Sequence, residues 1–419
     1  MQSQSAPAPI PRNALIFILI TAFLNLAGIG LIGPVSAFLV ERYLATPQEV
    51  AVASGLLFTS YSFFQFLAVP ALGVLSDRFG RRPVLLFCLL GSAAGYLLFG
   101  IGGALWVLFA GRIIDGITGG NLAAIFAYIA DLTEPKDRSR YYGLIGAVSG
   151  LGFVIGPAVG GALSQVGGPT APVYFAAFVT LLNMIWGYFA MPESLAPDKR
   201  IREINVARLN PLSQLIDVFR LPQLRWLLLA SFIFTLPFAL LSANLTVLGK
   251  DYLGAQPADI AIVFTVFGLV GIIVQGGLIR PLIARFGEFN LAVAGAVISA
   301  VGLFILSTVP TVRQTWDIIL GSAVFALGNG LLTPTLTGLI SQAVGAREQG
   351  RAQGGSQAVQ ALARVLGPIG GSAAYVQMSA GSPYWIGALL GILVVVCLYL
   401  ALPAIKAAMA LRAAPAHEG

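Results

Sequence analysis

The sequence predicts an all-α membrane protein with twelve transmembrane helices in two pseudo-repeated bundles of six. Three observations predict it: the composition, the number of long apolar segments and an internal repeat. Of the 419 residues, 57% are hydrophobic and only 10% are charged, whereas a soluble protein carries about 25% charged residues. The composition therefore excludes an ordinary soluble protein. The net charge of +7 predicts no nucleic-acid partner, because the basic residues cluster in short loops between apolar segments.

Twelve apolar segments have the length of a membrane span. A lipid-spanning helix needs about 20 apolar residues, and the segments are 14–38, 50–72, 83–104, 105–129, 141–165, 171–191, 225–249, 259–283, 289–309, 314–340, 352–376 and 384–409. An even number of spans places both termini on one side, and 19 of the 24 Lys and Arg residues fall on that side. Because cytoplasmic loops are enriched in Lys and Arg, we predict a multi-pass protein of the plasma (inner) membrane with both termini cytoplasmic.

One long polar loop divides the chain. It predicts an N-terminal six-helix bundle at 1–191, a cytoplasmic linker at 192–224 and a C-terminal six-helix bundle at 225–419. The linker contains a short amphipathic run, Leu212 to Phe219, which predicts a helix lying on the membrane surface.

Short motifs recur in the two halves. Arg78-Phe79-Gly80 returns after 207 residues as Arg285-Phe286-Gly287, and Gly156-Pro157 returns after 211 residues as Gly367-Pro368. Several matches in order at nearly one period indicate a duplication. Two parallel repeats around a site at the membrane midplane are typical of secondary transporters. The second hairpin has Ala284 where the first has Asp77, so the halves are not predicted to be functionally equal.

Two charged residues lie deep in the fourth apolar segment. Asp115 is about ten residues from Leu105, which places it about 15 Å into a hydrocarbon core of about 30 Å. A charge at this depth costs roughly 2.5–3.5 kcal/mol, and such residues mark ion or substrate paths. Arg112 lies three residues earlier on the same face. The two residues predict either a proton-coupling pair or a structural ion pair, and both interpretations hold if the pair opens in one state of the protein.

Other polar residues inside apolar segments are candidates for lining a substrate cavity. They are Asn25, Asn121, Asn329, Arg364 and Gln357. For each amide by itself, the alternative is a hydrogen bond that joins two helices.

The fifth apolar segment contains a regular series of small residues, namely Gly143, Gly152, Gly156, Pro157, Gly160 and Gly161. Three of the glycines are four residues apart, and such a stripe lets membrane helices pack closely. Pro157 removes one backbone hydrogen bond and bends the helix. On physical grounds alone, a generic tight helix crossing explains the same pattern.

A charge-dense loop joins the second and third apolar segments. Its notable residues are Gly73, Asp77, Arg78, Gly80, Arg81 and Arg82. The positive-inside rule explains the arginines by themselves. The glycines additionally permit a tight turn, and Asp77 has the chemistry to bind an arginine or a helix N-terminus. We therefore predict that the loop acts as a conformational gate.

This loop resembles the G-x-x-x-D-R-x-G-R-R signature of the major facilitator superfamily at every fixed position. The glycine series resembles the antiporter motif of the drug:proton antiporter branch of that superfamily. The stretches Gly28 to Pro34 and Gly111 to Gly119 also resemble motifs of that branch. The chain therefore resembles a tetracycline-efflux-like transporter of the major facilitator fold over almost its whole length.

The resemblance implies alternating access, with proton uptake driving efflux. It also implies that Asp77 pairs with Arg351, that Asp131 pairs with Arg81, and that Arg112 takes part in a proton relay.

The chain departs from the tetracycline exporters at two positions. Asn25 and Gly95 stand where those proteins carry acids. Tetracycline itself is therefore not predicted as the substrate. If a proton is carried, Asp115 is the only acid of the sequence at the right depth.

We predict a proton-coupled efflux antiporter for small hydrophobic compounds, monomeric in the lipid bilayer, without cofactor or metal and without enzymatic activity. Two alternatives are a proton-coupled or passive importer of a metabolite, which the antiporter motif disfavours, and a lipid or lysolipid transporter. A membrane-embedded enzyme would need a cluster of His, Cys or paired acidic residues, and the sequence has none.

Overall fold

A computed structural model describes residues 11–133, 135–201, 210–211, 219–344 and 348–413. Within these residues the chain is helical and forms no strand, which confirms the all-α class. The contacts divide the chain into two compact units. Unit 1 comprises Met1–Tyr43 and Ser60–Pro211, and unit 2 comprises Leu44–Thr59 and Leu212–Gly419. The contacts therefore group residues 44–59 with the second unit, whereas the predicted boundary lies in the linker.

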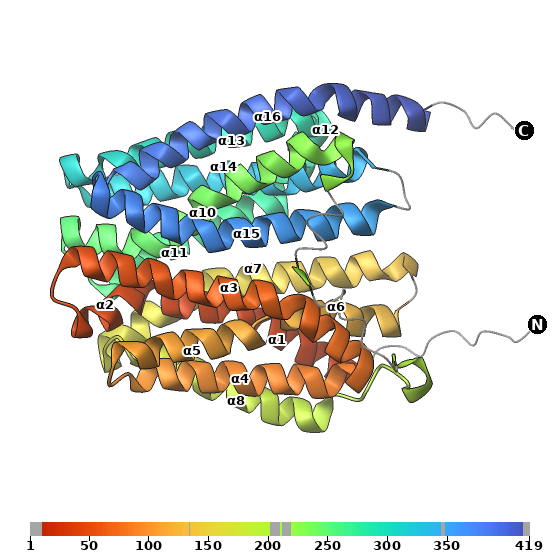
Figure 1. Cartoon of the computed structure of the whole chain (residues 1–419), viewed down its shortest axis with the longest axis horizontal. Coiled ribbons are helices and arrows are strands. Elements are labelled where there is room, and N and C mark those ends of the chain that lie inside the picture. The colour runs from red at the N-terminus through yellow and green to blue at the C-terminus, as the bar shows by residue number, and fades with distance from the viewer. Residues whose placement is uncertain (1–10, 134, 202–209, 212–218, 345–347, 414–419) are drawn as a thin grey trace, which may run out of the picture. The chain divides into compact units, whose positions relative to one another are not determined.

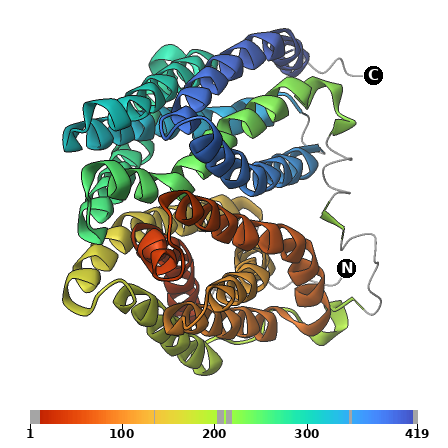
Figure 2. The same cartoon turned by 60° about the vertical axis from the view of Figure 1, so that its left-hand side comes forward.

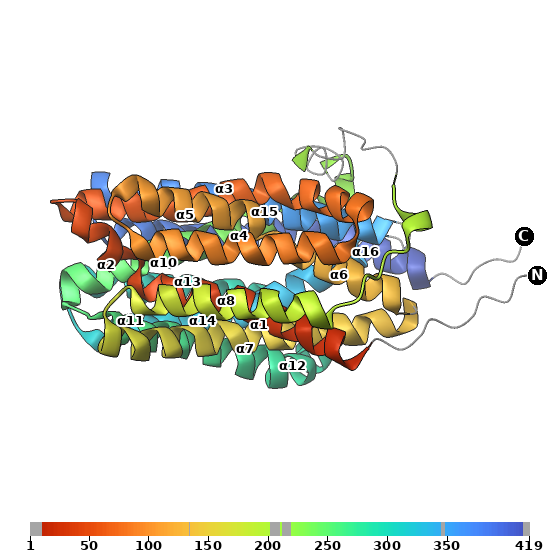
Figure 3. The same ribbon diagram turned by 90° about the horizontal axis from the view of Figure 1, so that it is seen from below.

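Unit 1 consists of long helices joined by short loops. They are α1 (Arg12–Ile32), α2 (Ser36–Val40), the later part of α3 (Pro47–Phe79), α4 (Arg81–Ile101), α5 (Leu105–Thr118), α6 (Asn121–Leu132), α7 (Pro135–Gly167) and α8 (Ala171–Ala190). Short 3-10 turns follow at Gly33–Val35, Glu41–Tyr43 and Pro197–Lys199. Inside this unit α1 packs on α7 and α8, and α4 packs on α5 and α8. Figures 1 and 3 both show α4 beside α5.

Unit 2 has the same general construction. Its helices are the first part of α3, the turn Pro222–Leu224, α10 (Arg225–Leu253), α11 (Pro257–Ile272), the π-helix Ile273–Leu278, α12 (Ile279–Phe286), α13 (Glu288–Val312), α14 (Thr315–Gln342), α15 (Gln349–Gln377) and α16 (Ser382–Ala413). Inside this unit α13 packs on α14 and α16, and α10 packs on α15 and α16. Figure 2 gives a second view of α10 to α16, coloured green to blue.

Eleven helical stretches of the described residues are long and apolar enough to cross a membrane. They match all the predicted segments except 352–376, which lies in α15. That helix is 29 residues long, but its glutamines and Arg364 make it more polar than the others. The multi-pass architecture is confirmed, and the membrane crossing by α15 stays a prediction. The predicted surface helix of the linker lies almost entirely outside the described residues.

The fourth predicted span is divided. We expected one helix over 105–129, but α5 ends at Thr118 and α6 begins at Asn121. Gly119 and Gly120 lie at the break, and two successive glycines favour it because glycine is a weak helix former. Interrupted helices at membrane depth are a common feature of transporter sites. The break lies one turn after Asp115.

Candidate functional site

Arg112 and Asp115 form a buried ion pair on α5. Nη1 of Arg112 lies 2.8 Å from Oδ2 of Asp115, and the two side chains are 7% and 4% exposed. Their spacing of three residues places both on one face of the helix. The predicted ion pair is therefore present. A desolvated pair of this kind loses most of its hydration, so its charges must be compensated by the groups around it.

Close packing of α4 on α5 surrounds the pair. A Cβ added at Gly95 of α4 would lie 2.7 Å from the carbonyl oxygen of Gly111 and 2.9 Å from Cβ of Asp115. There is consequently no room for a side chain at position 95. Oγ of Ser92 lies 3.3 Å from Oγ1 of Thr118, which adds a polar contact between the two helices. The helix crossing therefore keeps the pair away from water and lipid.

Two aromatic rings contact the guanidinium group of Arg112. Its Cζ lies 4.2 Å from the centroid of the Tyr61 ring on α3 and 6.0 Å from that of Phe99 on α4. These distances are typical of cation–π contacts. Arg112 thus has an acidic partner on its own helix and an aromatic partner on another.

A side chain of α3 binds the end of α5. Nε2 of Gln65 donates to the carbonyl oxygen of Gly119, at 3.0 Å, and to the Tyr61 hydroxyl, also at 3.0 Å. The last carbonyl groups of a helix have no partner inside it. Gln65 satisfies one of them at the break between α5 and α6, next to the ion pair.

Two of the predicted cavity residues bind each other. Nδ2 of Asn25 on α1 donates to Oδ1 of Asn121 at 2.7 Å, and Nδ2 of Asn121 donates back to Oδ1 of Asn25 at 3.1 Å. Asn121 is fully buried. This reciprocal pair joins α1 to the start of α6, which is the interhelical role considered for each amide.

The other predicted cavity residues lie in unit 2. Asn329 of α14 is half-buried and accepts a hydrogen bond from Thr333 at 2.7 Å. Arg364 of α15 is half-buried, and Gln357 of the same helix is exposed. Their role in a cavity stays a prediction.

The hairpin between α3 and α4 centres on Arg81, which is 7% exposed. Its guanidinium group pairs with Asp77, donates from Nη1 to Oγ of Ser76 at 2.7 Å, and donates from Nε to Oδ2 of Asp131 at 3.1 Å. Gly80 turns the chain with φ 107°, a conformation that favours glycine. The expected pairing of Asp131 with Arg81 is present.

The remaining hairpin residues have separate environments. The Arg78 guanidinium lies over the Phe79 ring, and that of Arg82 lies over the Tyr188 ring, at 5.4 and 5.2 Å from the centroids. A Cβ at Gly73 would have no atom within 4 Å. The side chain of Arg351 lies outside the part of the chain that is described, and its pairing with Asp77 stays a prediction.

Glu193, at the start of the linker, is a site residue that the sequence reasoning missed. Its Oε1 accepts the N–H of Arg81 at 2.9 Å and its Oε2 accepts that of Arg82 at 3.3 Å. These are the first N–H groups of α4, where a negative charge is stabilising. The following residue, Ser194, donates from Oγ to Asp131 at 2.9 Å. The available signal was an acidic residue at the start of the linker, close to the end of the preceding apolar segment.

The glycine stripe of α7 packs against the backbone of α1. A Cβ at Gly156 would lie 2.9 Å from Cα of Ala27, and one at Gly160 would lie 3.1 Å from the carbonyl oxygen of Leu31. Gly152 meets Phe23 in the same way. The other members of the series differ: Pro157 bears on Gly30 of α1, Gly161 is buried, and a Cβ at Gly143 would meet no atom within 4 Å. The stripe proper is therefore Gly152, Gly156 and Gly160.

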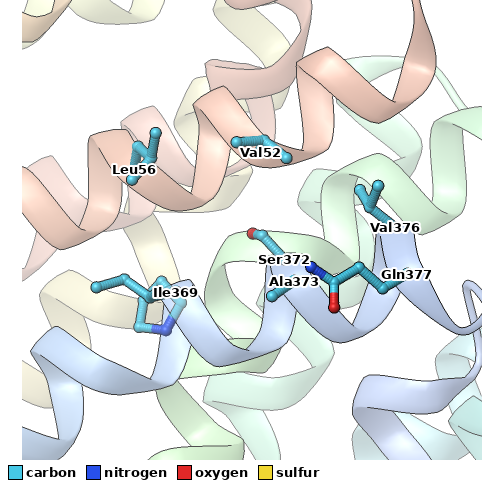
Figure 4. Close-up of a pocket in the computed structure, with 8 residues that line it drawn as sticks. Val52, Leu56, Ile369, Ser372, Ala373, Val376 and Gln377 are labelled. Carbon is cyan, nitrogen blue, oxygen red and sulfur yellow. The ribbon is translucent and has the colours of Figure 1, made fainter.

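An apolar groove of about 250 Å³ lies in unit 2 between the first part of α3 and α15 (Figure 4). It is lined by Val52, Leu56, Pro368, Ile369, Ser372, Ala373, Val376 and Gln377. Ser372 bonds the carbonyl oxygen of Ala51 and Oδ1 of Asn244, at 3.1 and 3.2 Å. The groove contains none of the predicted site residues.

The paired helical units, the interrupted helix and the buried charges define a membrane transporter. The chain matches the family model of the Major Facilitator Superfamily over residues 18–368, with a second match over 252–415. It belongs to that superfamily. Among the described residues no group of three or more His, Cys, Asp or Glu side chains is placed to hold a metal ion.

Resistance proteins are among the relatives of this chain. The chain is 35% identical to a tetracycline resistance protein, class C, of Escherichia coli, over 94% of this chain and 97% of that one. It is 29% identical to multidrug resistance protein 2 of Bacillus subtilis (strain 168), over 85% and 87% of the two chains.

Solved structures share the fold. The human organic anion transporter MFSD10 (TETRAN) superimposes with a TM-score of 0.71 at 24% identity, over 93% of this chain and 100% of that chain. A D-xylose-proton symporter gives 0.72 at 17% identity, over 94% and 99%. The predicted all-α fold of the major facilitator type is confirmed, and so is the prediction of a secondary active efflux transporter that is not an enzyme.

Proposed function

We propose that this protein exports small hydrophobic compounds across the inner membrane in exchange for protons, by alternating access between its two bundles. The observation that carries the proposal is the Arg112–Asp115 pair, buried on a helix that is interrupted one turn later. Charges at this depth are expensive and mark transport paths. The kinship with tetracycline and multidrug resistance proteins supports export of a small molecule.

Asp115 carries the proton in this proposal. In one state its carboxylate is ionised and paired with Arg112. In the other state the pair opens, and an oxygen of Asp115 takes a proton from the side of the membrane that is rich in protons. When the pair forms again, the proton leaves to the opposite side. Exchange follows if substrate binding favours the closed, ionised pair, because the substrate and the proton then exclude each other and occupy the protein in alternation.

The hairpin serves as the gate. The gate consists of the hairpin residues together with Asp131, and the hairpin residues are Gly73, Asp77, Arg78, Gly80, Arg81 and Arg82. Arg351 is the partner that we propose for Asp77 in one of the two states. Arg81 supports this role because it is buried with acidic partners on two sides. Removing one partner of a buried pair leaves the other uncompensated, so the network has the energy needed to bias two conformations.

The antiporter motif provides a rigid seal. Gly152, Gly156 and Gly160 bring the backbones of α7 and α1 together, and such contacts leave no space for a water path. Asn25, Asn121, Asn329, Arg364 and Gln357 are proposed to contribute to the substrate cavity in at least one state. The reciprocal bond between Asn25 and Asn121 would then open during the cycle.

We further propose that both termini are cytoplasmic and that the protein works as a monomer without a nucleic-acid partner. In this proposal the bundles 1–191 and 225–419 move about the linker 192–224. The asymmetry of Lys and Arg between the loops supports this orientation.

The test is uphill transport in proteoliposomes under an imposed pH difference. Tetracycline is the first probe, because the relatives are tetracycline resistance proteins, followed by a panel of lipophilic compounds. We expect Asp115→Asn to abolish pH-driven accumulation while downhill exchange of substrate persists. The matched control is Asp198→Asn, which removes an exposed carboxylate of the linker and should transport like the wild type. Accumulation of the probe by the Asp115→Asn variant against its gradient would disprove the role of Asp115.

A further inference from the structure

The guanidinium group of Arg112 has two partners of different kinds. One is the carboxylate of Asp115, at 2.8 Å on the same helix. The other is the face of the Tyr61 ring on α3, whose centroid lies 4.2 Å from Cζ. Only the first partner disappears when Asp115 takes a proton. The face of the ring stays negative whether or not Asp115 is protonated, because it comes from the π-electrons.

Tyr61 is held against α5 at two points that follow the ion pair along the chain. Its backbone carbonyl lies against Gly116, where an added Cβ would be 2.6 Å away. Its hydroxyl accepts a hydrogen bond from Gln65, which also binds the carbonyl oxygen of Gly119. Gly116 is the residue after Asp115, and Gly119 lies four residues after it, at the break that ends α5. The ring therefore stays opposite Arg112 as long as α3 and α5 keep their contact.

Few other groups face the pair in the described part of the chain. Tyr96 of α4 interacts electrostatically with both Asp115 and Arg112, Ser92 of α4 reaches the Asp115 carboxylate, and Phe99 of α4 lies 6.0 Å from the guanidinium. Tyr96 and Ser92 are neutral near pH 7, and the Phe99 ring is farther away than the Tyr61 ring. Tyr61 is thus the closest group that compensates the arginine without the carboxylate.

We propose that Tyr61 is a positioning residue, which holds Arg112 in place through its ring when Asp115 is protonated and thereby makes protonation possible at physiological pH. The inference rests on the proposed proton coupling. In the ionised pair the arginine is compensated chiefly by the carboxylate, whereas after protonation the ring is its closest remaining partner. Loss of the ring therefore costs the protonated state more than the ionised pair, because a poorly compensated buried cation is costly in a desolvated site. The ionised pair would then be favoured, and Asp115 would bind its proton only at lower pH.

The experiment follows the protonation of Asp115 directly, so that no substrate is required. Infrared difference spectra of the purified protein in lipid are recorded against pH. The carbonyl band of protonated Asp115 is identified by its loss in Asp115→Asn. The variants are Tyr61→Leu, which removes the ring, and Tyr61→Phe, which keeps the ring and removes the hydroxyl. The control is Phe63→Leu, which removes an exposed aromatic side chain of the same helix.

We expect the midpoint for Tyr61→Leu to move toward acid by about one pH unit, a tenfold weaker proton affinity, which is the scale of a desolvated cation–π contact. The midpoints for Tyr61→Phe and Phe63→Leu should stay close to that of the wild type. Replacement of Tyr61 by pentafluorophenylalanine keeps the ring shape but removes its negative face. It should shift the midpoint in the same direction as leucine, and it keeps the test valid if the leucine variant does not fold.

An unchanged midpoint in both the leucine and the pentafluorophenylalanine variants would overturn the role of Tyr61. The absence of any Asp115 band between about pH 4 and pH 10, roughly the range between the ordinary pKa values of a carboxyl and a phenol, would overturn it as well. The proposed function has its own failure, uphill transport by Asp115→Asn. The two results are therefore distinguishable.

Discussion

The two units contain the same helix crossing with different contents. In unit 1, Gly95 of α4 meets Gly111 of α5, and in unit 2, Gly302 of α13 meets Gly321 of α14. A Cβ on Gly95 or Gly302 would lie 2.7 or 2.8 Å from the carbonyl oxygen of its partner. Gly302 follows Gly95 after 207 residues, and Gly321 follows Gly111 after 210 residues. The crossing therefore follows the internal repeat.

The residue that packs on the first glycine differs between the units. It is Asp115 in unit 1 and Phe325 in unit 2, four residues after the second glycine in each case. Phe325 is fully buried, and its ring centroid lies 5.9 Å from that of Phe267. The crossing is therefore well packed without any charge. Because apolar residues often replace a buried ion pair without loss of stability, the comparison supports our proposal that Arg112 and Asp115 serve transport rather than packing.

The largest effect on stability is expected when the ion pair of unit 1 is replaced by apolar residues, first Asp115 alone and then Arg112 as well. Asp115→Leu leaves Arg112 buried without its acidic partner, which should lower the free energy of unfolding by about 3–5 kcal/mol. Adding Arg112→Met makes the crossing apolar as in unit 2, and should restore stability to within about 1 kcal/mol of the wild type or above it. Equilibrium unfolding in mixed micelles measures both, and proteoliposome assays should find no pH-driven transport in either variant.

Two results would refute this comparison. If the double variant is as unstable as Asp115→Leu, the pair is required for packing. If the double variant still transports against a gradient, the pair is not the coupling site.

An intermediate effect is expected at the glycine stripe of α7. Gly156→Leu would drive a side chain into the backbone of Ala27, and overpacking of this kind costs about 1–3 kcal/mol. We expect a proton leak or loss of coupling at nearly normal expression. The matched control is Gly150→Leu on the same helix, where an added Cβ meets no atom within 4 Å. Equal behaviour of the two variants in unfolding and proton-leak assays would show that the stripe is incidental.

The two hairpins repeat the contrast at the helix ends. Gly80 and Gly287 both turn the chain at positive φ, 107° and 77°, and each preceding arginine lies 5.4 Å from the centroid of the intervening phenylalanine ring. One residue later the chemistry diverges. Arg81 is surrounded by acidic partners, whereas Oε2 of Glu288 is buried without a hydrogen-bond partner among the described residues.

The smallest effects are expected here, and with opposite signs. Asp131→Asn removes one acidic partner of Arg81 but keeps an oxygen acceptor and leaves Asp77 and Ser76, so a loss of about 0.5–1.5 kcal/mol is expected. Glu288→Gln removes a charge that lacks compensation, and should change stability by no more than about 0.5 kcal/mol or increase it. Thermal unfolding in detergent compares the two, and a larger loss for Glu288→Gln would show that the second hairpin also depends on its acid.

Local sequence accounts for a large part of the site. The Arg112–Asp115 pair follows from a spacing of three residues on one helix, because neighbours on a helix face meet wherever the helix is placed. The stripe of Gly152, Gly156 and Gly160 follows from a spacing of four. The hydropathy pattern indicated eleven of the spans, because lipid demands a long apolar helix. The break at Gly119 was missed, although the pair of glycines was its signal.

The sequence by itself determined the class of fold, the repeat and the pairs that lie within one helix. The tertiary structure decided which residues of other helices contact the residues of these pairs. It placed Tyr61 of α3 on Arg112, Asn25 on Asn121, and Glu193 on the first N–H groups of α4. Residues that are 51, 96 and 112 positions apart meet because helices pack in three dimensions, and periodicity along the chain records only which face of a helix is apolar.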